Sequence, residues 1–150
     1  MKISHQFPLL AFSLLACNST TATGPGDLAY AAAANLVAQA PTKVQLRGTI
    51  TNTGSQSSTI HFGACSVGYR LYSYALVQGI SSPAYEFNPM NQLCIAIGYV
   101  KTLAPGEEYV MNSGQLTLSG QVPPGRYELR VTMYHDGVVG EASAGQIDIQ

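Results

Sequence analysis

The stretch VPPGRYELRVTMYHDGVVGEASAGQIDI, residues 122–149, decides the fold that this sequence predicts. Apolar residues share one face of its first half, at Tyr127, Leu129, Val131 and Met133. This two-residue period is typical of a β-strand with one buried face. The Asp136–Gly137 pair that follows favours a tight hairpin turn. The sequence therefore predicts a hairpin of two strands, over residues 126–134 and 138–149.

Tyr127 carries a more specific signal within this hairpin. It follows a turn at Pro124 and Gly125, and it precedes the inward-facing Leu129 by two residues. This is the layout of a tyrosine corner, in which the phenol hydroxyl bonds the backbone of the preceding loop of an immunoglobulin-like sandwich. The alternative is that Tyr127 is only a core aromatic residue.

The same period of two extends back along the chain to Lys43. Further short strands are expected at residues 43–50, 59–63, 67–74, 94–101 and 108–118. Turn-forming residues separate them at spacings of about 8 to 12 residues, which is typical of a sandwich or barrel. Together with the corner at Tyr127, the pattern predicts an all-β protein, an immunoglobulin-like β-sandwich of about seven to eight strands. The chain has no Trp, so the antibody pattern of a Trp against a disulfide is absent.

The N-terminus has the features of an export signal. Residues 1–17, MKISHQFPLLAFSLLAC, place Lys2 before an apolar run that is too short to span a bilayer. The ending Leu14–Cys17 resembles the lipobox of bacterial lipoproteins, which implies cleavage before Cys17 and acylation of that residue. The alternative is an ordinary signal peptide that happens to contain a Cys. We expect a lipoprotein signal peptide over residues 1–16 and a lipid anchor on Cys17.

The segment between the anchor and the strands is predicted to be a tether. Residues 18–27, NSTTATGPGD, are small and polar, as in flexible linkers. Residues 28–40 allow two interpretations. Asp27 could cap a helix through the alanines, or Asn35–Ala40 could be a first strand. We favour the strand because everything downstream is β, so the expected domains are a tether over residues 17–34 and a sandwich over residues 35–150.

Cys65 and Cys94 are the two cysteines left in the exported part of the chain. Thiols are oxidised in such compartments, and no zinc-binding spacing surrounds these two. We therefore predict a disulfide between Cys65 and Cys94. Closing a loop of this length stabilises a domain by about 3.5 kcal/mol in the chain-entropy model. Two buried free thiols are the alternative.

Composition and motifs exclude several functions. Only 10% of the 150 residues are charged and the net charge is -1, whereas nucleic-acid-binding domains carry a basic face. His61, expected to face solvent, and His135, expected at a polar hairpin turn, have no recognisable context for a metal site or a catalytic pair. No phosphate loop, dinucleotide fingerprint or hydrolase motif occurs. We expect no catalytic, cofactor-binding or metal-binding residue, so an enzyme is the least supported class.

Three motifs resemble a known family. TNTG (residues 51–54), TLAPGE (102–107) and VPPGRYEL (122–129) are similar to the bacterial intracellular proteinase-inhibitor (BsuPI-like) domain, over residues 43–133. The resemblance implies an immunoglobulin-like sandwich and either proteinase inhibition or non-catalytic binding. The family often holds a Trp after its LAPGE turn, where this chain has Val110–Asn112. An exported chain also cannot meet an intracellular proteinase. The resemblance is therefore used to predict the fold of this chain, and no inhibitory residue is assigned from it.

The leading hypothesis is thus a membrane-anchored, exported lipoprotein that acts as a non-catalytic binding or structural module. Its expected partners are the membrane, through the lipid on Cys17, and a protein of the bacterial cell envelope. Asn18, in place of an Asp, favours the outer membrane or cell surface. The alternative is an inhibitor of an extracytoplasmic proteinase, which would present the loop at residues 78–91 in a preorganised form.

Overall fold

Ten β-strands and one short 3-10 helix make up the part of the chain that the computed structural model describes, residues 22–23, 27–73, 82–91 and 97–150. The elements are β1 (Ala22–Thr23), β2 (Leu28–Gln39), β3 (Thr42–Asn52), β4 (Ser58–Gly63), β5 (Val67–Ser73), β6 (Tyr85–Phe87), η2 (Pro89–Asn91), β7 (Gly98–Leu103), β8 (Glu108–Thr117), β9 (Gly125–His135) and β10 (Val138–Ile149).

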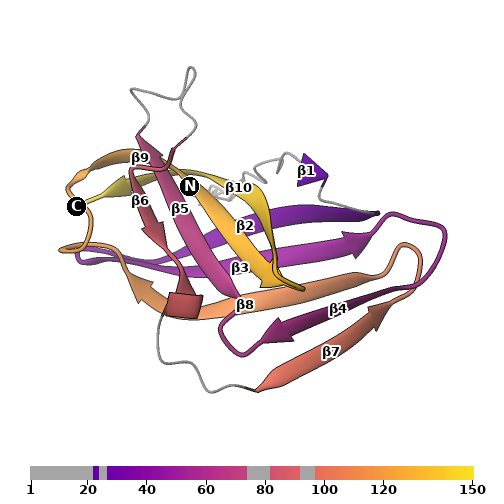
Figure 1. The fold of residues 1–150 in the computed structure, drawn as a ribbon. Coiled ribbons are helices and arrows are strands. Elements are labelled where there is room, and N and C mark those ends of the chain that lie inside the picture. Colours follow the sequence, from indigo (N-terminus) through magenta and orange to yellow (C-terminus); the bar gives the residue numbers. More distant parts are fainter. Residues whose placement is uncertain (1–21, 24–26, 74–81, 92–96) are drawn as a thin grey trace, which may run out of the picture.

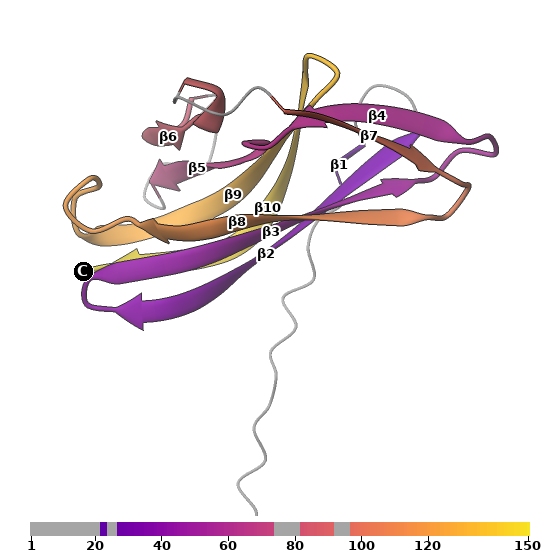
Figure 2. The same cartoon turned by 90° about the horizontal axis from the view of Figure 1, so that it is seen from below.

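The strands form two layers and a separate hairpin-like pair (Figure 1, Figure 2). One antiparallel sheet has the strand order β1-β2-β3-β8, and the other has the order β10-β9-β5-β6. Within the described ranges, β4 and β7 pair only with each other and form a third sheet. The predicted all-β sandwich is confirmed. The structure has more strands than the expected seven to eight, and two of them, β1 and β6, contain only 2 and 3 residues.

The core is built from both layers and from the β4–β7 pair, which contributes Ile60 and Leu103. Its largest fully buried apolar side chains are Tyr30, Val44, Leu46, Ile50, Ile60, Leu71, Leu103, Leu118, Leu129, Val131 and Met133. All residues of the core cluster lie between Leu28 and Ile149. A chain that lacks residues 1–17 therefore keeps the whole core.

The alternation that predicted the strands also decides which side chains reach this core. In β3, Val44, Leu46 and Ile50 are fully buried, whereas Gln45 and Arg47 between them are exposed. Gly48 occupies the remaining inward position because the Met133 side chain of β9 packs directly over it. The expected two faces of this strand are confirmed.

Residues 28–39 form one continuous strand, so the helix alternative for this segment is wrong. The strand begins at Leu28, and the expected start at Asn35 is too late. Alanine favours helices, but the pairing of β2 with β3 along its whole length outweighs that preference. Tyr30, which is 1% exposed, anchors the early part of β2 in the core. Residues 22–23, which pair with β2 as β1, and residues 28–34 thus belong to the sandwich and not to the predicted tether.

The hairpin between β9 and β10 has the predicted turn. Asp136 and Gly137 have φ angles of 48° and 74°, and a type I′ turn needs such positive values at both central residues. Further along, β10 contains a bulge between Ser143 and Gln146, where Gly145 has a φ of 91°. Because β10 pairs only with β9 in the described part of the chain, this bulge lies on a sheet edge.

Tyr127 forms the predicted tyrosine corner. Its hydroxyl donates a hydrogen bond of 3.1 Å to the backbone oxygen of Pro123, four residues upstream. The side chain is 7% exposed and its ring lies beside Gly125, where a Cβ would be 3.4 Å from the ring edge. The corner fixes the start of β9, and the alternative of a core aromatic without this bond is wrong.

Candidate functional site

Two of the predicted site residues lie outside the described residues. Cys17 belongs to the undescribed residues 1–21, and Cys94 belongs to the undescribed residues 92–96. Cys65 is half-buried just after β4. The lipid anchor and the disulfide therefore stay predictions. Within the described residues, no helix is long and apolar enough to cross a membrane.

The expected presentation loop at residues 78–91 is partly a structured strand. Its described part contains β6, which pairs with β5 at Tyr69–Leu71, and the short helix η2. Phe87 stacks on Tyr69 with ring centroids 5.5 Å apart. Residues 74–81 lie outside the description. The described half of the segment is thus held against the sheet and does not have the form of a free loop.

The turn between β9 and β10 brings together residues that the sequence kept apart. Asp136 donates its backbone N–H to the backbone oxygen of His61 at 2.9 Å. Its carboxylate accepts the backbone N–H of His61 at 3.1 Å and the Nδ1–H of the same residue at 2.7 Å. These three bonds fasten β4 to the end of the β9–β10 hairpin. An Asp suits this position because it tolerates a positive φ and carries a short acceptor.

His135 lies directly behind Asp136 and is buried, with 5% exposure. Its Nδ1 is 3.2 Å from the Asp136 carboxylate, and its Nε2 is 2.8 Å from the Tyr30 hydroxyl. An ionised carboxylate only accepts, so Nδ1 carries the hydrogen and the Tyr30 hydroxyl donates to Nε2. The expectation that His135 lies on a polar turn surface is wrong, because the strand alternation continues inward from Met133 to His135. His61 is exposed as expected.

The charge of Asp136 is favoured by these contacts. Partial burial acts to raise the pKa of its carboxyl, but the hydrogen bonds from His61 and His135 outweigh this effect and lower the pKa below its ordinary value. Burial and the nearby negative charge of Asp136 raise the pKa of Tyr30. The array therefore holds one carboxylate anion at the surface, with a neutral phenol at its buried end.

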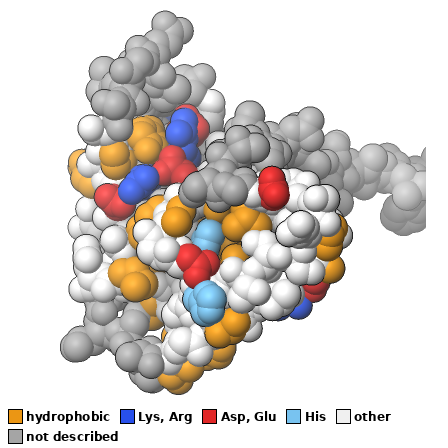
Figure 3. Space-filling model, turned by 45° about the vertical axis from the view of Figure 1, so that its right-hand side comes forward, with side chains coloured by type: hydrophobic (Ala, Val, Ile, Leu, Met, Phe, Trp, Pro, Cys, Tyr) orange, Lys and Arg blue, Asp and Glu red, His pale blue; other side chains and the backbone are white. Residues whose placement is uncertain are grey.

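A largely apolar groove of about 780 Å³ opens beside this array. It lies between the adjoining ends of β4 and β7, the β9–β10 turn and Met90 of η2. Exposed apolar residues line it, namely Met90, Ile97, Tyr99, Val100 and Val139, with exposures of 40% to 65%. Figure 3 shows two histidines flanking an acidic side chain, with hydrophobic side chains gathered around them. In the described part of the chain, Leu36 and Val37 are the only other large apolar residues with comparable exposure.

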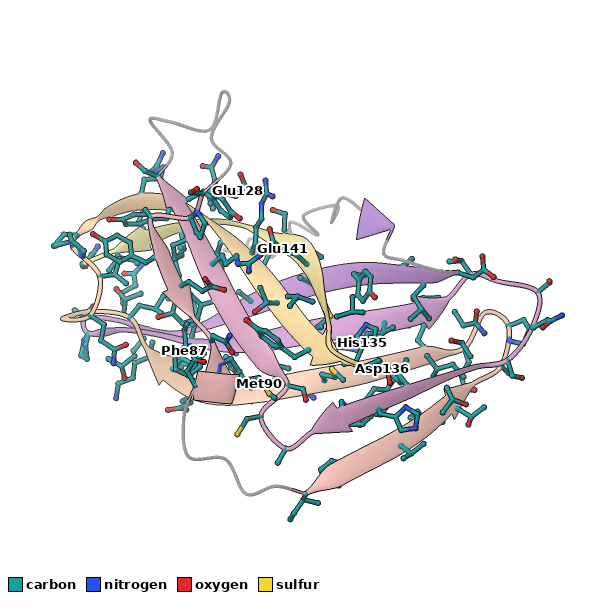
Figure 4. The ribbon with its side chains drawn as sticks, in the orientation of Figure 1. Phe87, Met90, Glu128, His135, Asp136 and Glu141 are labelled. Atoms are coloured by element: carbon teal, nitrogen blue, oxygen red, sulfur yellow. The ribbon has the colours of Figure 1, made fainter. Side chains whose placement is uncertain are left out.

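A second polar cluster lies on the outer face of the β10-β9-β5-β6 sheet, away from the groove. Glu141 contacts Arg70 at 2.7 Å and Arg130 at 3.2 Å, and these two arginines are cross-strand neighbours. Like charges directly opposite each other repel, and Glu141 between them offsets that repulsion. In Figure 4, Glu128 and Glu141 lie towards the opposite end of the sheet from His135 and Asp136. The cluster holds three neighbouring strands together.

The groups beside the His61–Asp136 pair decide what chemistry this pair could support. No group of three His, Cys, Asp or Glu side chains among the described residues could hold a metal ion. The hydrogen bonds found for the His61 ring go to Asp136. His61 and Asp136 are arranged like the general base and the orienting carboxylate of a catalytic triad. In the described part of the chain, however, no serine or threonine is hydrogen-bonded to the exposed side of His61 as a nucleophile would be.

Comparisons with known proteins add no relative. No protein-family model matches the chain, and no curated protein is significantly similar to it. The resemblance to the BsuPI-like domain therefore rests on its three motifs and stays a hypothesis.

Sequence reasoning missed the groove and the role of Asp136. His61 and Asp136 are 75 positions apart, and only the packing of β4 against the β9–β10 turn brings them together. The turn motif at Asp136 and Gly137 predicted an Asp at the tip of the hairpin, because positive φ angles favour Asp, Asn or Gly there. It did not predict which residues the Asp136 side chain contacts. The exposed apolar residues on β7 had no distinguishing pattern in the sequence.

Proposed function

We propose that this protein is an exported, lipid-anchored, non-catalytic binding module, and that the groove beside Asp136 is its binding surface. One observation carries this proposal: five of the seven exposed large apolar side chains among the described residues line this single groove. Soluble proteins rarely leave such side chains exposed together unless a partner covers them. Burial of these side chains against a partner is the expected source of affinity.

The groove is also held in shape before any partner arrives. The bonds between Asp136 and His61 fix the end of β4, and the Tyr134 backbone N–H donates to the Ser66 oxygen at 2.9 Å just beyond it. A preformed surface loses little conformational entropy on binding. This favours recognition of a partner over a role as a passive spacer.

The N-terminal sequence supports attachment to a membrane of the cell envelope, at the outer membrane or cell surface. With lipid on Cys17, residues 18–21 would separate the anchor from β1, which pairs with β2 at Ala29 and Tyr30. Four extended residues reach at most about 14 Å, so the domain would stay near the membrane surface. Replacing Cys17 by Ser should leave an unprocessed precursor, visible as the larger mass of residues 1–150. A lipid-free product cut elsewhere would contradict the anchor.

The binding proposal is tested by cross-linking in envelope extracts with the chain that begins at Asn18. Val100→Asp places a charge in the groove at a side chain that is 65% exposed, so the fold tolerates it. Ser57→Asp is the matched control, because Ser57 is also exposed but lies before β4 and outside the groove. We expect the same partner with the wild type and Ser57→Asp, and its loss with Val100→Asp. Equal capture by all three proteins would show that the groove is not the binding surface.

A further inference from the structure

The groove has an electrostatic character that narrows what can fill it. Asp136 is the only Asp, Glu, Lys or Arg among the described residues that line it. The side chain is 35% exposed, and its hydrogen bonds come from His61 and His135. Lys101, on the neighbouring stretch of β7, is paired with Glu107 at 2.7 Å and does not line the groove. An apolar surface with one anion is complementary to an apolar ligand with one cation.

Aromatic side chains reinforce this preference. Phe62 and Tyr99 stack with ring centroids 5.6 Å apart, and both line the groove. The faces of aromatic rings attract ammonium and guanidinium groups.

From these observations we infer that the groove binds an apolar peptide segment of a partner protein that carries a single lysine, with its ammonium beside Asp136. The inference rests on the proposed binding function and names the chemistry of the partner. The volume of about 780 Å³ is within the range of pockets that enclose drug-sized ligands, so it accepts several side chains at once. A zwitterionic lipid head group fits less well, because its phosphate would be brought towards the same carboxylate.

The test uses three capped peptides, Ac-GSVLXLVSG-NH₂, in which X is Lys, Gln or Glu. Binding to the chain that begins at Asn18 is followed by amide chemical shifts at pH 8 and low salt, which give both affinity and location. We expect shifts around Asp136, Val100 and Val139, with affinity falling in the order Lys, Gln, Glu. A charge at this distance near a protein surface is expected to separate Lys from Glu by about tenfold.

Three variants locate the origin of that preference. Asp136→Asn should bring the Lys and Glu peptides to nearly equal affinity. Val100→Lys should remove the preference for the Lys peptide, because its charge offsets that of Asp136 without touching the hydrogen bonds of Asp136. This variant decides the matter if Asp136→Asn fails to fold. Asp148→Asn is the control. Asp148 lies at the other end of β10 and pairs with Arg126 of β9, so this variant should leave the order of affinities unchanged.

The outcomes separate this inference from the proposed function. Equal binding of all three peptides in the groove would overturn the lysine preference and leave the binding surface intact. A preference for Lys that survives both Asp136→Asn and Val100→Lys would overturn the assignment to Asp136. No binding of any peptide to the groove would overturn the inference and weaken the proposed function with it.

Discussion

The two ends of β9 are both fixed by a tyrosine hydroxyl, but over very different distances along the chain. At its start, Tyr127 bonds a carbonyl only four residues away. At its end, His135 receives the hydroxyl of Tyr30, which lies 105 residues away on β2. The first contact closes a local turn. The second joins the two layers of the sandwich and supports the Asp136 array in front of it.

This difference shows what a side-chain hydrogen bond contributes in each setting. Pro123, which accepts from Tyr127, is exposed, so water can replace the lost donor. His135 is buried, so nothing replaces Tyr30. An unsatisfied buried polar group costs much more than a lost bond at the surface. We therefore expect the long-range end of β9 to be the more sensitive one.

Removing the carboxylate at the long-range end should have the largest effect. Asp136→Ala leaves His135 Nδ1 and the His61 backbone N–H without their acceptor and puts a Cβ-bearing residue without local bonds at a φ of 48°. The expected loss is about 3 kcal/mol of unfolding free energy, measured by urea denaturation. Asp136→Gly is the control, because it also lacks the carboxylate but tolerates the positive φ, so its difference from Asp136→Ala gives the contribution of backbone strain. A loss below about 1 kcal/mol would show that the array is not a structural unit.

Tyr30→Phe tests the buried contact with the ring retained. It leaves Nε2 of His135 unsatisfied inside the sandwich, and we expect a loss of about 2 kcal/mol in the same assay. The stacking of the two rings, with centroids 5.7 Å apart, should survive. A cost near zero would mean that His135 adopts its other tautomer and finds another partner.

Tyr127→Phe is the same chemical change at the local end. Because the Pro123 carbonyl can be hydrated, we expect a smaller loss, about 1 kcal/mol. Denaturation of Tyr30→Phe and Tyr127→Phe side by side makes the comparison direct. If Tyr127→Phe costs as much as Tyr30→Phe, burial of the partner does not explain the difference between the two ends.

The smallest expected effect is a dependence on pH. The pKa of Asp136 is lower in the folded protein than in the unfolded chain, where it is about 3.9. The carboxylate therefore stabilises the fold fully at pH values above the unfolded pKa. That contribution is lost as the pH falls from there through the folded pKa. The difference in unfolding free energy between the wild type and Asp136→Asn should therefore shrink below about pH 4. A difference that stays constant down to pH 2 would contradict the lowered pKa.

Sequence reasoning succeeded where the deciding contacts are local. The period of two gave β3 and β9, and the turn before Tyr127 gave the corner, because each depends on residues within a few positions. It failed over residues 28–34, where pairing with β3 overrides the helical preference of alanine. It also failed at His135, where the alternation of β9 continues inward to the last residue and the Tyr30 hydroxyl, 105 positions away, satisfies the buried ring. The groove could not be predicted, since it exists only where β4, β7 and the β9–β10 turn meet.

The bulge at Gly145 has a consequence for copies of this domain at high local concentration. Crowded copies of a sandwich meet at their sheet edges, and an unbroken edge strand can pair with a neighbour and begin a fibril. The interruption between Ser143 and Gln146 breaks the regular edge of β10 and limits how far such a pairing can run. The geometry of β10 thus gives the domain a local protection against edge-to-edge aggregation.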